Sequence, residues 1–237
     1  QINLLDESNR PTETNVNVTL YDQQTELVSY NYFHTMNAAG VPDTVTIDPV
    51  TYYRAVAHTI PPVERKDIKI TPGKHNIIAL KTPQGDLLVN MTKGPAYDEV
   101  DVIVKKSGDC DILNVQSVNE KERYLTGSYD IEVLTTPKLT FNNIKISQSS
   151  TTKIEVPSPG KVSIQSAYNA IAGIYTYRKN ELIKVASINA STRRELIHLQ
   201  PGNYTIIYIP KNSYNSEETR EKSFKVTSGS FTNLNLF

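Results

Sequence analysis

YDIEVLTTPKLTFNNIKI, residues 129–146, is one of two closely similar stretches in this chain of 237 residues. The other is YRAVAHTIPPVERKDIKI, residues 53–70, which lies 76 residues upstream. Five positions match in register, Tyr53, Thr59, Pro61, Ile68 and Ile70 against Tyr129, Thr135, Pro137, Ile144 and Ile146. Self-similarity at a fixed period indicates tandem copies of one structural unit. We call this stretch the repeated segment.

A third, weaker copy of the repeated segment lies near the end of the sequence. LQPGNYTIIYIP, residues 199–210, corresponds to LTGSYDIEVLTTP, residues 125–137. A Phe-Lys-Val triplet at residues 224–226 then matches the Ile-Lys-Ile triplet at 144–146, after a longer polar connection. The copies predict three domains, at residues 1–83, 84–158 and 159–237, with Gly85 and Gly160 just after the boundaries.

Alternation of apolar and polar residues is the main secondary-structure signal. It is clear at residues 16–20, 100–104 and 153–156, and Gly, Pro, Asn or Ser bounds each of these runs. Helical spacing is not evident in any long window. A unit of roughly 75 residues has room for about seven short antiparallel strands in two sheets. The sequence therefore predicts an all-β chain of three tandem, small, seven-stranded β-sandwich domains of immunoglobulin-like type, arranged as a semi-rigid rod.

The repeated segment has a structural interpretation of its own. Gly-x-Tyr after a turn, at Gly127 and Tyr129 and again at Gly202 and Tyr204, resembles a corner in which a buried tyrosine ties its hydroxyl to the backbone. The first domain departs from this pattern, because an Asp-Pro-Val turn precedes two adjacent tyrosines, Tyr52 and Tyr53. Proline two residues after the threonine donates no hydrogen bond, so it is expected to end strand pairing. These features favour an architectural role for the segment over a catalytic one.

Composition excludes several classes of partner. Lys plus Arg equals Asp plus Glu at 25 each, so no excess positive charge attracts nucleic acid. Apolar runs are far shorter than the roughly 20 residues of a transmembrane helix. Residues 1–20 lack a signal-peptide pattern, which leaves a cytosolic, a processed or an excised chain as alternatives. The single cysteine, Cys110, excludes an internal disulfide and is expected to be a half-buried strand residue.

Candidate catalytic and metal-binding residues are few. None of the four histidines, His34, His58, His75 and His198, stands at a short ligand spacing from another, although His58 and His75 flank one passage and are candidates to meet. The acidic groups Asp109/Asp111 and Asp98/Glu99/Asp101 match no calcium-loop spacing and are expected to lie in solvated turns. Nucleophile-elbow, phosphate-loop and dinucleotide motifs are missing from the sequence. The prediction is a chain that is not an enzyme and holds no cofactor or metal.

Two aromatic clusters are the candidate interaction sites. Tyr30, Tyr32 and Phe33 fall within four residues, so one strand places aromatic side chains on both of its faces. Tyr175, Tyr177 and Arg178 form the second cluster, in the third domain. Exposed tyrosines beside Arg or Asn are typical of protein contacts or of sugar stacking. Packing against a neighbouring domain is the alternative explanation.

Three long phrases carry a resemblance to a known family. HTIPPVERKDIKITPGKHNIIALKTPQGDL, GSYDIEVLTTPKLTFNNIKISQSSTTKIEVPSPG and LQPGNYTIIYIPKN resemble the C-terminal half of Bacteroidetes von Willebrand factor A (VWA) domain proteins of the cell envelope. The resemblance covers nearly the whole chain, and it implies small sandwiches similar to prealbumin-like modules. The adhesion motif Asp-x-Ser-x-Ser of the VWA domain is not matched, because Asp6-Glu-Ser8-Asn-Arg10 fails at its last position. The chain therefore resembles the part that follows the VWA domain.

This resemblance implies where the chain acts and with what. It implies export to the periplasm or cell surface and an envelope protein as partner. Asp43-Thr44-Val45 resembles the short Bacteroidetes O-glycosylation signal, with Thr44 as the acceptor. The leading hypothesis is a non-catalytic envelope stalk and protein-interaction module, part of a larger VWA-type protein or complex. The alternative is a glycan-binding or adhesion module that uses the exposed tyrosines of the first domain.

Overall fold

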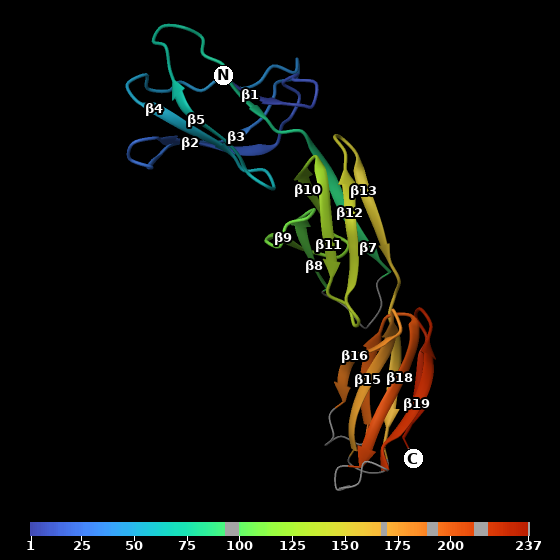
Figure 1. The fold of residues 1–237 in the computed structure, drawn as a ribbon. Coiled ribbons are helices and arrows are strands. Elements are labelled where there is room, and N and C mark those ends of the chain that lie inside the picture. The colour runs from blue at the N-terminus through green and yellow to red at the C-terminus, as the bar shows by residue number, and fades with distance from the viewer. Residues whose placement is uncertain (93–99, 167–169, 189–193, 211–217, 237) are drawn as a thin grey trace.

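The computed structural model describes residues 1–92, 100–166, 170–188, 194–210 and 218–236. The chain is all-β and folds as three small β-sandwiches, called modules 1, 2 and 3, that follow one another along the chain (Figure 1). The chain changes direction between modules 1 and 2 (Figure 1). The divisions predicted at 83/84 and 158/159 fall in the connections between the last strand of one module and the first of the next. Among the described residues, no helix is long and apolar enough to span a membrane.

Module 1 contains six strands in two sheets. They are β1 (Ile2–Leu5), β2 (Val16–Asp22), β3 (Val28–His34), β4 (Tyr52–Ala57), β5 (Val63–Lys69) and β6 (Ile78–Lys81). Strands β3-β2-β4-β5 form an antiparallel sheet, and β1 pairs with β6 in parallel.

Modules 2 and 3 share a seven-strand version of this topology. Module 2 contains β7 (Gln84–Met91), β8 (Asp101–Lys106), β9 (Ile112–Ser117), β10 (Lys121–Leu125), β11 (Gly127–Val133), β12 (Leu139–Ile146) and β13 (Thr151–Val156). Module 3 contains β14 (Gly160–Gln165), β15 (Ala170–Arg178), β16 (Glu181–Ile188), β17 (Arg194–Leu199), β18 (Gly202–Pro210), β19 (Arg220–Val226) and β20 (Phe231–Asn235). In each, a three-stranded sheet (β10-β7-β13 or β17-β14-β20) faces a four-stranded one (β12-β11-β8-β9 or β19-β18-β15-β16).

Each module has its own hydrophobic core, built from the alternating positions of its strands. The buried side chains at the centres of the three cores include Leu4 and Leu20, Leu87 and Ile131, and Ile174 and Ile206. Burying a side chain of this size contributes about 1.5–3 kcal/mol. Because the inward residues alternate with exposed ones, the period-2 pattern of the sequence specifies which face of each strand meets the core.

Three sequence-based expectations need correction. Module 1 has six strands where about seven were predicted, because residues 44–48 alternate in exposure like a strand but pair with none. An alignment of Asn76-Ile77 with Lys153-Ile154, which the similar strands after the repeated segment suggest, is out by one residue, because Ile77 is 55% exposed and Ile78, at the offset of 76, occupies the buried position. Cys110 is exposed in the turn between β8 and β9, since the strand pattern stops at the Gly-Asp pair before it.

Gly85 and Gly160 lie where two backbones approach closely. A Cβ on Gly85 would overlap the carbonyl oxygen of Ser147 and stand 2.9 Å from Cγ2 of Ile146. A Cβ on Gly160 would overlap Cγ1 of Val226 and stand 2.7 Å from the carbonyl oxygen of Thr227. Glycine is therefore required sterically at the start of the first strand in both modules.

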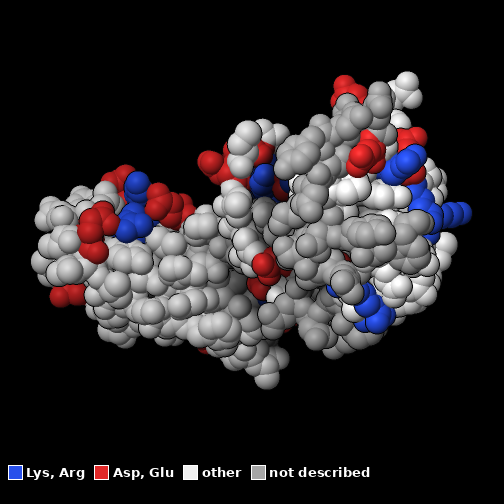
Figure 2. Space-filling view, turned by 90° about the horizontal axis from the view of Figure 1, so that it is seen from below, with Lys and Arg blue, Asp and Glu red and all other residues white. Residues whose placement is uncertain are grey.

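Charged residues of both signs are distributed over the surface. The described acidic and basic side chains that Figure 2 displays lie among one another and do not form one large patch of a single sign. Several are paired, as in Arg54 with Glu26 (2.6 Å) and Lys138 with Glu132 (2.7 Å). This arrangement matches the equal numbers of acidic and basic residues in the sequence.

Candidate functional site: the joints between modules

The loop after the Tyr-containing strand is built identically in modules 1 and 2. The Thr59 hydroxyl donates to the carbonyl oxygen of Pro61 (2.6 Å), and the Thr135 hydroxyl donates to that of Pro137 (2.8 Å). Both threonines are buried, and the peptide bonds before both prolines are cis. As predicted, strand pairing ends before each proline. The hydroxyl bond closes the loop around a single residue, Ile60 or Thr136.

That central residue joins each module to the next. The carbonyl oxygen of Ile60 accepts from the backbone N–H of Leu125 in module 2 (2.8 Å). The carbonyl oxygen of Thr136 accepts from the backbone N–H of Gln200 in module 3 (2.7 Å). Leu125 and Gln200 each lie four residues before the corner tyrosine of their module. The same donor and acceptor positions thus form both joints.

The corner tyrosine holds the residue that receives the neighbouring loop. The Tyr129 hydroxyl donates to the carbonyl oxygen of Leu125, and the Tyr204 hydroxyl donates to that of Gln200, both at 2.7 Å. Burial raises the pKa of Tyr129 to about 12, so the hydroxyl keeps its proton at physiological pH. Each joint therefore combines two parts of the repeated segment, the threonine–proline loop of one module and the tyrosine corner of the next.

Module 1 has the tyrosine corner but uses its amide differently. The corner tyrosine is the buried Tyr53, rather than the exposed Tyr52. Its hydroxyl donates to the carbonyl oxygen of Asp48 (2.7 Å). The backbone N–H of Asp48 donates to the hydroxyl of Tyr30 at 3.1 Å. The backbone N–H that donates to the preceding module in modules 2 and 3 is thus, in module 1, hydrogen-bonded within the module itself.

The joint between modules 1 and 2 has further contacts. The Ile60 side chain packs against the hydrophobic core of module 2. Arg123 donates to the carbonyl oxygen of Thr14 (3.3 Å), and the backbone N–H of Glu7 donates to the side chain of Gln148 (2.9 Å). Apolar packing and several hydrogen bonds together fix module 1 against module 2.

A polar cavity of about 320 Å³ lies within this joint. Its walls include Glu13, Gln84 and Arg123, and the backbone N–H of Gln84 donates to Oε1 of Glu13 at 3.4 Å. Glu13 is 8% exposed, and desolvation raises the pKa of its carboxyl, partly offset by the bond from Gln84. The side-chain nitrogen of Gln84 is buried with no hydrogen-bond partner. The joint therefore buries a carboxyl group whose charge is unfavourable there.

We expect Glu13→Gln to stabilise modules 1 and 2 at pH 7 but not at pH 4. The folded-state pKa of Glu13 lies above its ordinary value of 4.5. The wild-type chain therefore loses stability as the pH rises from the ordinary pKa through the folded-state pKa, whereas glutamine does not titrate. Glutamine keeps the acceptor for Gln84, so the gain is a fraction of one kcal/mol. Urea denaturation at both pH values measures it. Glu7→Gln, at an exposed position nearby, is the control, and an equal Glu13→Gln effect at both pH values would contradict the prediction.

The joint between modules 2 and 3 shows fewer contacts among the described residues. Beyond the bond from Gln200 to Thr136, the Ser228 hydroxyl of module 3 donates to the carbonyl oxygen of Ser158 in the linker (3.0 Å). The Ser158 hydroxyl in turn donates to the carbonyl oxygen of Thr92 (3.3 Å). The side-chain amide of Gln200 is buried with no hydrogen-bond partner. Thr136 supplies no apolar side chain comparable to that of Ile60.

The first aromatic cluster divides between the two faces of β3. Tyr30 and Tyr32 point inward and pack against the core of module 1, with the ring of Tyr30 6.3 Å from that of Tyr53. Phe33 points outward and is 58% exposed. The expectation that the strand carries aromatics on both faces is confirmed. Only Phe33 of the three presents an open ring, and glycan binding at this cluster stays a prediction.

The second aromatic cluster lies on β15. Tyr177 is 68% exposed, and Arg178 stands opposite Glu181 on β16. The ring of Tyr175 covers Gly173, where a Cβ would stand 2.8 Å from it. Tyr177 also borders a shallow cavity over β15, β18 and β19 that Asn203 and Ser223 help to line. Tyr177 and Arg178 are accessible to a partner, whereas Tyr175 is partly covered.

The candidate histidines and acids do not converge. Nε2 of His58 is 2.8 Å from the hydroxyl of Thr19, and Nε2 of His75 is 2.9 Å from Oε1 of Gln1, so these two do not meet. His34 is buried in module 1, and His198 lies on β17 of module 3. Within the described part of the chain, no group of three or more His, Cys, Asp or Glu residues could hold a metal ion.

The remaining single-residue candidates have these positions. Thr44 is exposed. Asp109 and Asp111 are exposed beside Cys110, and Asp98 and Glu99 lie outside the described residues. Asp101 is exposed but is the first residue of β8, so the expectation of a turn is wrong for it. Asp6, in the string closest to the adhesion motif, is fully buried and accepts from the backbone N–H of Arg10 (2.8 Å). That backbone bond is the main reason that the pKa of Asp6 is lowered, so this carboxylate closes a turn.

Comparisons with known proteins give only distant matches. No family model matches the chain, and no curated protein matches it. The Bacillus anthracis TIE protein aligns over 99% of this chain and 49% of its own length, with 12% identity and a TM-score of 0.27. The minor pilin GBS52 of Streptococcus agalactiae aligns over 64% of this chain and 94% of its own, with 10% identity and a TM-score of 0.33. The pilus adhesin SpaC of Lactobacillus rhamnosus GG aligns over 99% of this chain and 42% of its own length, with 10% identity and a TM-score of 0.23. The chain thus spans about half the length of the TIE protein, and TM-scores this low do not establish a common fold.

Proposed function

We propose that this chain is a non-catalytic stalk that holds protein-interaction surfaces at a set spacing in the cell envelope. The observation that carries the proposal is the repeated joint, in which the Ile60 and Thr136 carbonyls accept from the corner amides of Leu125 and Gln200. A joint made twice from equivalent atoms favours a fixed relation between neighbouring modules. A fixed orientation suits a spacer, because it keeps the distance between the first and the last module constant.

The linkers support the same role. Only Thr82 and Pro83 separate β6 from β7, and only three residues separate β13 from β14. Those three include Pro157 and Pro159, whose rings restrict the backbone. Short linkers that contain proline limit the motion between domains far more than flexible Gly/Ser linkers do.

The location and the larger protein are further parts of this proposal. The resemblance to Bacteroidetes VWA-type envelope proteins supports an exported chain that acts within a larger protein or complex. An exposed Thr44 is compatible with O-glycosylation of an exported protein. Exposed apolar and aromatic side chains outside the joints, such as Phe33 and Tyr177, are candidate contacts for an envelope partner.

The spacer role predicts a single, narrow distribution of distances between modules 1 and 3. Spin labels at the exposed positions Asn31 and Lys225, in a Cys110→Ser background, allow that distance to be measured by pulsed electron resonance. A broad distribution would contradict the spacer role. The interaction role is tested separately, by capture of envelope proteins on the immobilised chain, and it fails if the chain enriches no envelope protein over a matched β-sandwich bait.

A further inference from the structure

Among the described strands, each module has one parallel pair, which joins the first strand of the module to its last. β1 pairs with β6, β7 with β13 and β14 with β20 in parallel. Every other pair of described strands is antiparallel. Because parallel strands run in the same direction, the chain enters a module at one end of this pair and leaves at the other. We call the three pairs the terminal pairs.

Tension along the chain passes directly through the terminal pairs. Linkers of only a few residues connect β6 to β7 and β13 to β14, and Figure 1 shows β13 leading from module 2 toward module 3. A pull on both ends of module 2 therefore draws β7 and β13 in opposite directions along their common axis. The bonds of a parallel ladder are evenly spaced, so they are loaded together, in shear.

The last strands of modules 2 and 3 each have a single neighbour among the described strands. β13 lies at the edge of the sheet β10-β7-β13, and β20 at the edge of β17-β14-β20. Thr151–Val156 pairs with residues 86–91, and Phe231–Asn235 pairs with residues 161–165. Pulling the last strand free requires that this one ladder break. The ladder therefore sets the force at which the module opens.

Backbone hydrogen bonds extend both of these ladders beyond the paired residues. In module 2, the N–H of Asp86 donates to the carbonyl oxygen of Ser150 (2.8 Å), just before β13. In module 3, the equivalent N–H of Lys161 donates to the carbonyl oxygen of Ser230 (2.7 Å), just before β20. The same added bond thus strengthens the start of the last strand in both modules.

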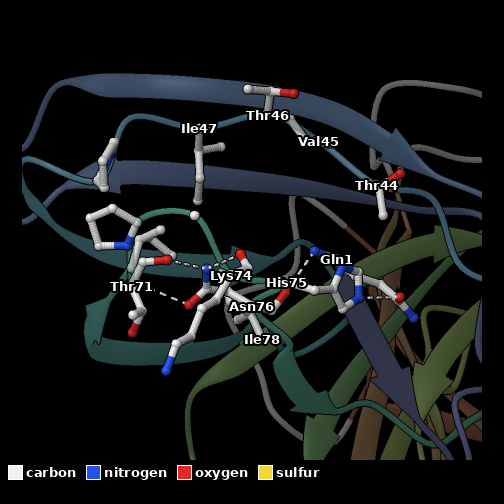
Figure 3. Close-up of a pocket in the computed structure, with 14 residues that line it drawn as sticks. Gln1, Thr44, Val45, Thr46, Ile47, Thr71, Lys74, His75, Asn76 and Ile78 are labelled. Carbon is white, nitrogen blue, oxygen red and sulfur yellow. Dashed lines mark hydrogen bonds between the residues drawn. The ribbon is translucent and has the colours of Figure 1, made fainter.

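Module 1 also fastens the start of its last strand. The backbone N–H of Ile78 in β6 donates to the carbonyl oxygen of Gln1 (2.9 Å). The side chain of Asn76 closes the turn before β6, since it accepts from the backbone N–H of Thr71 (3.0 Å) and donates to the carbonyl oxygen of Lys74 (2.9 Å). Figure 3 shows these residues beside Ile78. All three terminal pairs therefore have a bonded turn at this end.

Inward side chains of the last strands oppose sliding of the ladder. Ile154 and Val156 of β13 lie in the core of module 2, and Leu234 of β20 lies in the core of module 3. A slip of one residue would turn such side chains from the core to the solvent face. The ladder therefore has no low-cost way to yield in steps of one residue.

We propose that this chain bears tension along its length, with the three terminal pairs as the load-bearing ladders. The observation that carries the proposal is the parallel pairing of first and last strands in all three modules. This function goes beyond the proposed spacer role, because a spacer needs to keep its shape only while no force acts on it. A chain that bears tension has to stay folded while its two ends are pulled apart.

The test compares two directions of pulling on module 2 of the full chain, in a Cys110→Ser background, with optical tweezers. Handles on Lys81→Cys and Pro157→Cys, both at exposed positions, load the β7–β13 pair in shear. Handles on Thr92→Cys and Pro157→Cys load it from one end, because the carbonyl oxygen of Thr92 accepts from the hydroxyl of Ser158 (3.3 Å). In shear, module 2 should rupture at a force at least about twofold higher, since several bonds share the load.

Proline substitutions in β13 provide a second measurement. Because Ser150 accepts from Asp86 and bonding alternates along an edge strand, the N–H of Thr152 faces β7 and that of Lys153 faces the free edge. Thr152→Pro removes a ladder bond, so the lifetime of module 2 under a constant shear force should fall at least about fivefold. Lys153→Pro should keep most of the wild-type lifetime. Thr152→Ala controls for the lost bond from the Thr152 hydroxyl to the carbonyl oxygen of Lys145.

Either of two outcomes would overturn the inference. One is an equal rupture force in the two directions of pulling, since the terminal pair would then not resist in shear. The other is an equal lifetime under shear for Thr152→Pro and Lys153→Pro, since the ladder bonds would then not carry the load. The distance distribution between modules 1 and 3 is measured without force, so the spacer role is decided separately.

Discussion

Gly85→Ala is expected to destabilise module 2 by about 3 kcal/mol, because the added methyl group would overlap the carbonyl oxygen of Ser147. The overlapped atom belongs to the backbone, so no side-chain rotation relieves it. Either β7 or the turn after β12 has to shift, and that shift breaks the bonds that Gln84 and Asp86 make with this turn. Urea denaturation, followed by a probe in module 2, measures the loss.

Gly127→Ala is the matched control for this prediction. Gly127 also lies in module 2, but a Cβ there would meet nothing closer than 3.6 Å, on the ring of Tyr129. Its free energy of unfolding should stay within about 1 kcal/mol of the wild-type value, since alanine is tolerated at least as well as glycine in an unstrained strand. Equal effects of Gly85→Ala and Gly127→Ala would show that the close approach of the Ser147 carbonyl oxygen to β7 does not make glycine necessary at residue 85.

The repeat and the strands could be predicted because both depend on local pattern. Alternation at residues 16–20 and 100–104 specified strands whose inward residues form the observed cores. The Gly-x-Tyr corners at Tyr129 and Tyr204 were also predictable, since a buried tyrosine needs an acceptor and the turn supplies a carbonyl. Fold and corner chemistry follow from short stretches of sequence.

The joints could not be predicted, because they depend on contacts between residues that the sequence separates widely. Ile60 and Leu125 are 65 positions apart, and their bond uses backbone atoms that carry no sequence signal. One clue was present. The Thr-x-Pro loop occurs in modules 1 and 2, whereas Pro210 stands where module 3 would place the threonine. The sandwich itself therefore does not require this loop.

The aromatic cluster of module 1 shows a different limit. Alternation predicted that Tyr30 and Tyr32 share one face of β3 and Phe33 the other, but it did not say which face meets the core. Tyr30 points inward, and its hydroxyl accepts from the amide of Asp48, whose counterparts in modules 2 and 3 donate to a neighbouring loop. That role became visible only when the three corners were compared as structures.

Ile60→Asp is expected to uncouple module 1 from module 2 while both modules stay folded. The side chain of Ile60 packs against the core of module 2 from a loop of module 1, so its loss costs about 2 kcal/mol at the joint and little within module 1. The carbonyl of residue 60 remains, but a carboxylate beside an apolar surface disfavours the closed joint. Spin labels at Asn31 and Lys145, in the Cys110→Ser background, should give a broader distance distribution, and calorimetry should resolve separate unfolding transitions.

Val50→Asp is the control for this change, because it introduces the same charge at an apolar residue of module 1 that is 87% exposed. It should leave both the distance distribution and the unfolding transitions as they are in the wild-type chain. If Ile60→Asp behaved like Val50→Asp, the hydrogen bonds from Leu125, Arg123 and Glu7 would be sufficient to hold the joint. A broadened distribution for Ile60→Asp alone would instead mean that apolar packing fixes this joint. The joint at Thr136, which lacks an isoleucine, would then be the more flexible point of the stalk.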